Sequence, residues 1–203
     1  MEKVGHYIIR GFILTFLAMF FCGGIYTGSV TMVAQIFFKD KANGSMIEID
    51  GINYGSSLVG QHFTGNRYMW GRFISVERDF IKVNKPKEKE VFYPTASNIS
   101  PAGIRYEKLI KQRINRIKSV YTEKKDTPIP VELITGSGSG LDPHISYKAA
   151  VYQVERLARV RKIDEHKIKE IIDKCTDDKL LGILGEKTVN VFKVNLYLDG
   201  ILI

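Results

Sequence analysis

The chain begins with one long apolar segment, after which apolar and polar positions alternate in much shorter patterns. Residues 11–38 contain no charged side chain. As an α-helix, this segment is about 42 Å long, which is enough to cross a hydrocarbon core of ~30 Å. A cleaved secretory signal is the alternative, but its apolar part usually spans about 7–15 residues and ends at a small-residue cleavage site. No such site closely follows the segment, so the pattern predicts an uncleaved membrane anchor.

The positions after the anchor alternate over short distances, which favours strands and turns. In residues 41–55, Asp50-Gly51 separates two short β-prone runs, and this arrangement is a strong hairpin signal. The aromatic residues 67–75 are expected to be buried or to face a partner, whereas the Lys- and Glu-rich residues 82–90 predict an exposed loop. Further extended segments are predicted at residues 56–63, 131–135 and 188–198, the last a strand of about ten residues.

Helical periodicity predicts three helices. Residues 97–121 contain the first, with Ser100 as its N-cap and Pro101 in its first turn. Ser146 is expected to cap the second, and Asp164 the third, whose core-facing side chains are Ile168, Ile171 and Ile172. The first helix carries basic side chains that predict either a solvated face or a basic docking surface: Lys108, Lys111, Arg113, Arg116 and Lys118.

These elements predict an α/β chain with a single N-terminal transmembrane helix followed by one mixed α/β extracytoplasmic domain. The expected boundaries are residues 1–10 for a short cytoplasmic N-terminus, 11–38 for the anchor and 39–203 for the soluble domain. The flanking Lys and Arg residues are nearly balanced across the anchor. The positive-inside rule therefore favours an N-terminus inside the cell only weakly.

The formal net charge is +8, and most of the excess lies in residues 39–203. Nucleic acid is disfavoured as a partner because no aromatic–basic binding motif is present. A basic face beside anionic lipid or an acidic partner fits this charge better. Of the two cysteines, Cys22 lies in the anchor and Cys175 in the soluble part. No intrachain disulfide is therefore expected, and Cys175 is predicted to be buried on a helix face.

The anchor also contains small residues at helical spacing. Gly24 and Gly28 form a G-x-x-x-G pattern, which lets two helices approach closely in lipid. This pattern predicts that the anchor packs against another membrane helix.

Residues 135–146 (TGSGSGLDPHIS) contain side chains typical of several kinds of site. Ser137, Ser139, Asp142 and His144 are the ingredients of a hydrolytic triad, but neither serine lies in a G-x-S-x-G elbow. The glycines follow the spacing G-x-G-x-G, which departs from the dinucleotide and Walker A loops. None of the four histidines has a Cys or His at metal-ligand spacing.

A structural turn fits residues 135–146 best. Asp142 and Ser146 can accept hydrogen bonds from backbone amides at the start of the following helix, and Pro143 stiffens the exit from the turn. So many special residues in one short segment also suggest a contact surface.

Several motifs together carry a resemblance to a known family. They are KANGS (residues 41–45), GSSLVGQHF (residues 55–63), SGSGLDPHIS (residues 137–146), AAVYQVERLARVR (residues 149–161) and LLGILGEKTVNVFKVNLYLDG (residues 180–200). In this order, and behind a single N-terminal anchor, they resemble the C subunit of Kdp-type potassium-transporting ATPases.

The resemblance implies an accessory, non-catalytic subunit of an ATP-driven potassium importer in the cell membrane. Its partners would be a channel-like potassium-translocating subunit and a P-type ATPase catalytic subunit, whose ATP affinity it raises as a catalytic chaperone. The resemblance implies no covalently bound cofactor. It implies ATP as the nucleotide used by the complex, and it leaves open whether this chain contacts ATP directly. The candidate nucleotide or partner contacts are Gln61, Ser137, Gly138, Ser139, Gly140, Asp142 and His144. A membrane-anchored binding module and a tethered serine hydrolase remain the alternatives.

Overall fold

The computed structural model describes residues 2–74, 76–81, 89–94, 98–121 and 127–202. The chain separates into two units, Met1–Met46 and Ile47–Ile203. The first unit is helical and consists of α1 (Glu2–Ala18), a π-helical stretch η1 (Met19–Tyr26), α2 (Thr27–Phe37) and the single turn α3 (Lys39–Ala42).

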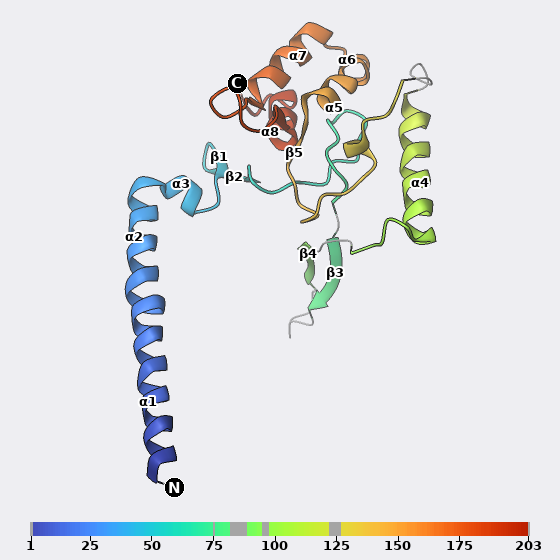
Figure 1. Cartoon of the computed structure of the whole chain (residues 1–203). Helices are drawn as coiled ribbons and strands as arrows, with labels where there is room; N and C mark the ends of the chain where they lie inside the picture. The colour runs from blue at the N-terminus through green and yellow to red at the C-terminus, as the bar shows by residue number, and fades with distance from the viewer. Residues whose placement is uncertain (1, 75, 82–88, 95–97, 122–126, 203) are drawn as a thin grey trace. The chain divides into compact units, whose positions relative to one another are not determined.

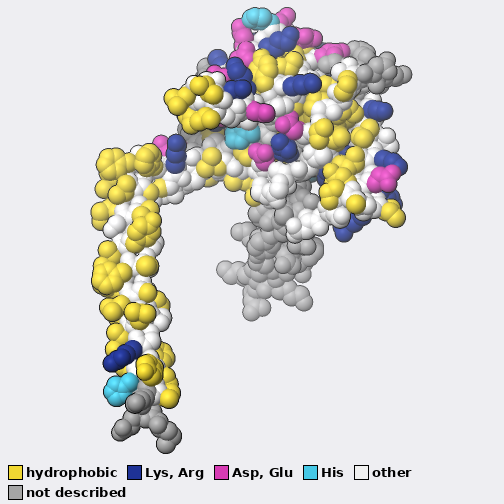
Figure 2. All heavy atoms as spheres, viewed as in Figure 1, with side chains coloured by type: hydrophobic (Ala, Val, Ile, Leu, Met, Phe, Trp, Pro, Cys, Tyr) yellow, Lys and Arg dark blue, Asp and Glu magenta, His cyan; other side chains and the backbone are white. Residues whose placement is uncertain are grey.

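The segment Val4–Phe37 is, within the described residues, the one helix long and apolar enough to cross a membrane. Figure 2 shows hydrophobic side chains along most of the length of this helix on the side in view. Two of its hydroxyl groups are bonded to the helix backbone, as Thr27 Oγ1 donates to Cys22 O at 2.8 Å and Ser29 Oγ donates to Ile25 O at 2.8 Å. Such internal bonding is what an apolar environment requires of a polar side chain.

The second unit begins with the predicted hairpin. Strands β1 (Met46–Ile49) and β2 (Ile52–Ser56) pair around Asp50 and Gly51, whose φ angles of 52° and 75° place both residues in the left-handed region. A two-residue turn with both central φ angles positive matches the twist of antiparallel strands, and Asp-Gly tolerates it well. The hairpin prediction is confirmed.

A second hairpin was not predicted. Strand β3 (Val76–Ile81) pairs antiparallel with β4 (Lys89–Pro94). The predicted exposed loop at residues 82–90 is therefore wrong at its end, where Lys89 and Glu90 belong to β4. Its remaining part, residues 82–88, lies outside the described residues.

The third sheet has three short antiparallel strands in the order β5–β7–β6. They are β5 (His144–Ser146), β7 (Thr188–Asn190) and β6 (Thr176–Asp177). This sheet brings His144 opposite Asn190, so it links the segment 135–146 to the C-terminal part of the chain.

Two predicted element starts are wrong for local reasons. Helix α4 (Ile104–Val120) begins after Gly103, because Gly103 N donates to Ser100 O at 3.0 Å and closes a turn first. Ser100 is therefore not its N-cap. The predicted strand at residues 131–135 is instead a 3₁₀ turn, η2 (Val131–Leu133), in which Leu133 N donates to Pro130 O.

The next helices start where the sequence predicts. Ser146 Oγ accepts from Ala149 N at 3.2 Å at the start of α5 (Tyr147–Tyr152), and Asp164 Oδ1 accepts from His166 N at 2.6 Å at the start of α7 (Glu165–Lys174). The predicted second helix is divided after α5, and its remainder forms α6 (Val154–Arg161).

The predicted strand at residues 188–198 is wrong beyond its third residue. Asn190 Oδ1 accepts from Lys193 N at 3.1 Å and caps helix α8 (Val191–Leu198). This helix is apolar on nearly all sides because it lies within the core, and such a sequence has no clear helical face. Residues 57–63 are likewise irregular rather than extended, since β2 ends at Ser56, whose Oγ accepts from Leu58 N at 3.1 Å.

Helices α5–α8 gather around one hydrophobic core (Figure 1). Met69 and Trp70 from the aromatic segment are buried in it, as are Ile117 of α4 and Leu133 of η2. Cys175 is buried, as predicted, but it follows α7 and does not lie on a helix face.

Candidate functional site

The glycine–serine loop, which we define as residues 136–143, runs from η2 to β5 and is attached to three other segments. Two carbonyls near its C-terminal end are bonded, because Gly60 N donates to Leu141 O at 2.7 Å and Val191 N donates to Pro143 O at 3.0 Å. At its start, Gly136 forms an isolated parallel bridge with Phe73. The loop is thus held in place by neighbours that are distant in the sequence.

The approach of Gly60 to this loop excludes any side chain there. A Cβ at position 60 would lie 2.8 Å from Asp142 O and 3.0 Å from Leu141 O. Real Cβ atoms almost never come so close to backbone atoms, so this junction requires glycine. The first residue of the sequence motif GQHF, Gly60, is therefore a glycine for a structural reason.

The two serines of the loop accept hydrogen bonds from its own backbone. Ser139 Oγ accepts from Leu141 N at 3.2 Å, and Ser137 Oγ accepts from Asp142 N at 3.4 Å. Gly140 N donates to Ser137 O at 3.2 Å. Gly138 and Ser139 form the exposed edge of the loop, while Gly140 is buried. Three of the amides that could hold an anion here, those of Gly140, Leu141 and Asp142, are therefore already engaged.

A chain of contacts among charged side chains connects the loop to neighbouring segments. Asp142 Oδ1 accepts from His144 N at 2.9 Å, and its Oδ2 lies 3.0 Å from Arg72 Nε. Arg72 Nη2 donates to Glu132 Oε1 at 3.3 Å. Glu132 Oε2 then accepts from both the backbone N (3.0 Å) and the Oγ (2.7 Å) of Ser146. These contacts join η2, the loop and the start of α5.

The Arg72–Asp142 contact is an ion pair without a hydrogen bond. The Arg72 Nε–H is buried and not aligned with an acceptor, although the carboxylate is only 3.0 Å away. Both side chains remain about a quarter to a third exposed, so the pair is partly screened by solvent. The sequence analysis did not identify Arg72 or Glu132 as site residues. Arg72 lies within the aromatic segment 67–75, and Glu132 lies two residues after Pro130.

His144 does not contact the serines. Its Nε2 lies 3.3 Å from Asn190 Nδ2 and 3.7 Å from Asp177 Oδ2, and its Nδ1 is 3.7 Å from Asp142 Oδ1. Among the described residues, no hydrogen bond joins His144 to Ser137 or Ser139. A serine nucleophile needs such a base within hydrogen-bonding reach, so the arrangement does not favour the tethered hydrolase.

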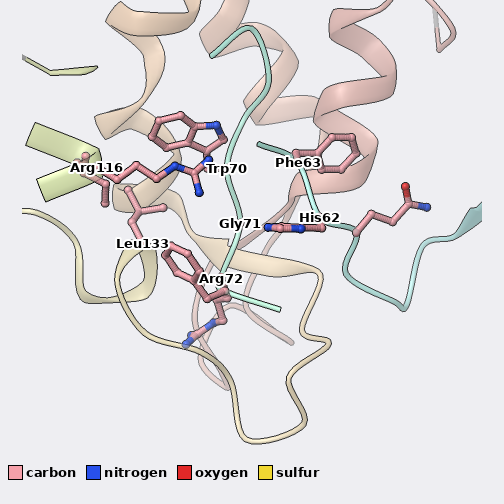
Figure 3. Close-up of a pocket in the computed structure, with 10 residues that line it drawn as sticks. His62, Phe63, Trp70, Gly71, Arg72, Arg116 and Leu133 are labelled. Atoms are coloured by element: carbon pink, nitrogen blue, oxygen red, sulfur yellow. The ribbon is translucent and has the colours of Figure 1, made fainter. Parts of the chain in front are cut away.

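Gln61 lies beside the loop and lines a small cavity. Its Nε2 donates to Tyr54 O at 3.4 Å. The cavity measures about 30 Å³ and is also lined by Trp70, Arg72 and Arg116. Figure 3 shows Trp70 and Arg116 near each other and Arg72 on the opposite side. A volume of this size holds one or two water molecules, whereas small-molecule pockets usually measure about 300–1,000 Å³.

An open groove lies on the outer side of the loop. It has a volume of about 580 Å³ and is lined by Ser137, Gly138 and Ser139 on one side and by Leu58 and Val59 on the other. Leu58 and Val59 are exposed. The predicted contact residues therefore fall in two places, with the serines facing the groove and Gln61 facing the small cavity. Their role as nucleotide or partner contacts stays a prediction.

Two buried amide side chains position the segment that carries Arg72. Asn195 of α8 accepts from Met69 N at 2.7 Å and donates to Met69 O at 3.0 Å. Gln153 does the same for Trp70, at 2.8 Å in both directions. The sequence analysis did not single out either residue, although a polar residue within an apolar helical stretch is the signal that could have found them.

Arg156 completes this buried network. Its Nε donates to the Tyr121 hydroxyl at 2.6 Å, its Nη2 donates to Gln153 Oε1 at 2.8 Å, and its guanidinium lies 4.1 Å from the centre of the Trp70 ring. Burial lowers the pKa of Arg156 and raises the pKa of Tyr121, because both ionised forms lose solvation.

The basic side chains of α4 divide into two groups. Arg113 Nη1 donates to Ile134 O at 2.9 Å with its guanidinium 3.7 Å from the Phe73 ring centre, and burial lowers its pKa. Arg116 Nη2 donates to Thr64 O at 3.1 Å. These two arginines therefore face the domain, whereas the three lysines, Lys108, Lys111 and Lys118, are exposed. The solvated-face prediction holds for the lysines only.

Comparison with known proteins gives consistent matches over almost the whole chain. A relative from Clostridium perfringens, named potassium-transporting ATPase KdpC subunit, is 53% identical over 196 residues, which cover 96% of this chain and 98% of the relative. Proteins of the same name from Clostridium botulinum Eklund 17B and Paraburkholderia xenovorans are 46% and 39% identical, each with 95% of this chain covered and with 95% and 96% of the relative covered. The KdpC family model, described as K⁺-transporting ATPase, c chain, matches residues 8–200. The chain therefore belongs to the KdpC family.

Proposed function

We propose that this chain is the C subunit of an ATP-driven potassium importer, needed for assembly of the complex and for a high ATP affinity of its catalytic subunit. The observation that carries the proposal is the family match over residues 8–200, supported by relatives aligned over nearly their full length. The chain contains no D-K-T-G phosphorylation motif. ATP hydrolysis is accordingly assigned to a separate P-type ATPase subunit, with potassium carried by a channel-like subunit.

We place the soluble domain outside the cytoplasm and the N-terminus inside. On that side the domain meets no cytosolic ATP, so its effect on ATP affinity passes through the partner subunits. Two features support this indirect route. The cavity beside Arg72 and Arg116 has room for only a water or two, and the amides of Gly140, Leu141 and Asp142 already donate within the chain.

The glycine–serine loop then serves as a rigid contact surface. Its two serine hydroxyl groups and three of its amides fix its own shape. The open groove beside Leu58 and Val59 offers apolar area to a partner. Preorganisation of this kind lowers the entropic cost of association. In this role the domain caps the potassium entrance and holds the two larger subunits together.

The test is the potassium-stimulated ATPase activity of the complex purified through a tag on this chain. We expect two larger membrane subunits to co-purify. The apparent ATP affinity should fall by about fivefold or more when the complex is prepared without this chain, which is the usual lower range of allosteric coupling. Purification of the chain alone, together with an ATPase indifferent to its presence, would favour the membrane-anchored binding module instead.

A further inference from the structure

The connection between β6 and β7 carries the most exposed aliphatic cluster of the described part of the second unit. We call residues 180–184 the apolar tip. Its four large side chains are Leu180, Leu181, Ile183 and Leu184, with exposed fractions of 67%, 84%, 81% and 60%. None of them belongs to the hydrophobic core. Figure 1 shows this connection as a loop at the margin of the domain, beside the C-terminus.

The apolar tip has a defined fold of its own. Leu180 N donates to Leu184 O at 2.8 Å, and Leu184 N donates back to Leu180 O at 3.0 Å. Leu181 has a φ of 55°, a left-handed conformation that is costly for leucine. Strain of this kind persists where the surrounding structure imposes it, and it often marks functional segments. The hydrogen bonds thus present the aliphatic side chains to the outside in a fixed arrangement.

Charged side chains of both signs surround the apolar tip. Lys179 and Glu186 are exposed beside it, and Lys187 Nζ lies 2.8 Å from Asp178 Oδ1. Segments that enter an anionic membrane surface usually carry surplus Lys and Arg and interfacial Trp or Tyr. The tip has neither feature. An apolar centre within a polar rim is instead the usual anatomy of a protein–protein interface.

We propose that the apolar tip inserts into an aliphatic pocket, rimmed by charges of both signs, on another subunit of the potassium-transporting ATPase. The inference rests on the proposed function, because it requires that this chain works within that complex. It assigns the anchoring of the soluble domain to a segment far in sequence from the glycine–serine loop. The paired charges at the base of the tip would then fix its orientation in the pocket.

The test is the dissociation of this chain from the detergent-solubilised complex. The variant combines Leu181→Asn, which suits the left-handed backbone, with Ile183→Ser. The matched control combines Ile104→Ser with Val131→Asn, whose apolar side chains are similarly exposed but lie on other elements. We expect the tip variant to dissociate about tenfold faster or more, as for an interface hot spot, and the control to stay within about twofold of the wild type.

A photoreactive amino acid in place of Ile183 identifies what the tip touches. Cross-linking to one of the larger subunits supports the proposal. Cross-linking to lipid alone, or dissociation of the tip variant at the wild-type rate, overturns it. Slow alkylation of the buried Cys175, measured with both variants in a Cys22→Ser background, shows that the domain remains folded.

The outcomes separate this inference from the proposed function. If the wild-type chain does not co-purify with the ATPase subunits, both are wrong. If the wild type co-purifies and supports potassium-stimulated activity while the tip variant dissociates no faster, then the proposed function stands and the docking role of the tip is overturned.

Discussion

Two amide side chains supply Met69 and Trp70 with the hydrogen bonds that a neighbouring strand would otherwise give. Asn195 and Gln153 each accept from the amide and donate to the carbonyl of one of these residues. All of these groups are buried, so each bond that is lost leaves a polar group without water to replace it. The path of this segment, and with it the place of Arg72, depends on the two amides.

We expect Gln153→Ala to lower the free energy of unfolding by about 2–4 kcal/mol, because it leaves the Trp70 amide and carbonyl unpaired in the core. Chemical denaturation of the full chain in detergent measures this change. Gln112→Ala, at an exposed position of α4, is the control and should change the free energy by less than about 0.5 kcal/mol. Equal effects of the two substitutions would contradict the proposed bracing by Gln153.

Cys175 offers a direct probe of folding. Burial raises the pKa of its thiol to about 12 from 9.0. The thiolate is the reactive form, so at pH 8 its alkylation in the folded domain should be roughly a thousandfold slower than in the unfolded chain. The rate is measured with a thiol reagent in a Cys22→Ser background, where Cys175 is the remaining thiol. Equal rates with and without denaturant would show that Cys175 is not buried.

The same shift makes the stability of the domain depend on alkaline pH. The folded state keeps the Cys175 proton that the unfolded chain loses above pH 9. The contribution of the neutral thiol is therefore complete below pH 9 and declines by about 1.4 kcal/mol per pH unit up to about pH 12. In the Cys22→Ser background, the denaturation midpoint should therefore be lower above pH 9 than at pH 8. Adding Cys175→Ala should reduce the difference between the two midpoints.

At the level of the elements, sequence patterns predicted best those boundaries that local chemistry decides. The Asp50-Gly51 turn and the caps of α5 and α7 are confirmed, since a turn or a cap depends on a few adjacent residues. The strand predicted at residues 188–198 fails because burial on all sides removes the helical periodicity of α8. Neither η2 nor the pairing of β3 with β4 was predicted, because η2 is a single turn closed by Leu133 N and Pro130 O, and charged residues interrupt the apolar pattern of both strands.

In the candidate site, too, the sequence predicted the contacts that depend on adjacent residues and missed those between distant segments. The sequence identified Ser146 as a helix cap, which is confirmed. It also predicted that Asp142 accepts from an amide at the start of the following helix, but the amide from which Asp142 accepts is His144 N, which lies in β5. It did not identify Arg72 or Glu132, because the chain of contacts from Asp142 to Ser146 closes only when η2, the aromatic segment and the loop meet.

The two helix caps Asp164 and Asn190 should differ in their importance. Asp164 is exposed and caps α7, so Asp164→Ala should cost about 1 kcal/mol. Asn190 is buried, caps α8 and also donates to Ser57 O at 2.8 Å, so Asn190→Ala should cost about 2–3 kcal/mol. Denaturation of both variants beside the exposed control Asn115→Ala measures the difference. Similar losses for the two caps would contradict the second role of Asn190.

At the scale of the whole molecule, the apolar helix Val4–Phe37 exposes its side chains on all sides within this chain. Among the described residues of the first unit, no atom lies within 4 Å of a Cβ added at Gly24 or Gly28. A larger side chain at either position would therefore meet no obstacle within this helix. We attribute any loss of assembly that it causes to a neighbouring helix in the membrane.

We expect the double substitution Gly24→Leu and Gly28→Leu to weaken assembly of the potassium-transporting complex without preventing membrane insertion. Leucine is as compatible with lipid as any residue and favours the helix, but it holds a neighbouring helix backbone farther away. Co-purification of the larger subunits with the tagged chain measures the effect. Gly11→Leu, in the same helix but outside the G-x-x-x-G pattern, is the matched control and should leave co-purification unchanged. If the double variant assembles as well as this control, the anchor acts as a tether, and the contacts that hold the complex together must lie in the soluble domain.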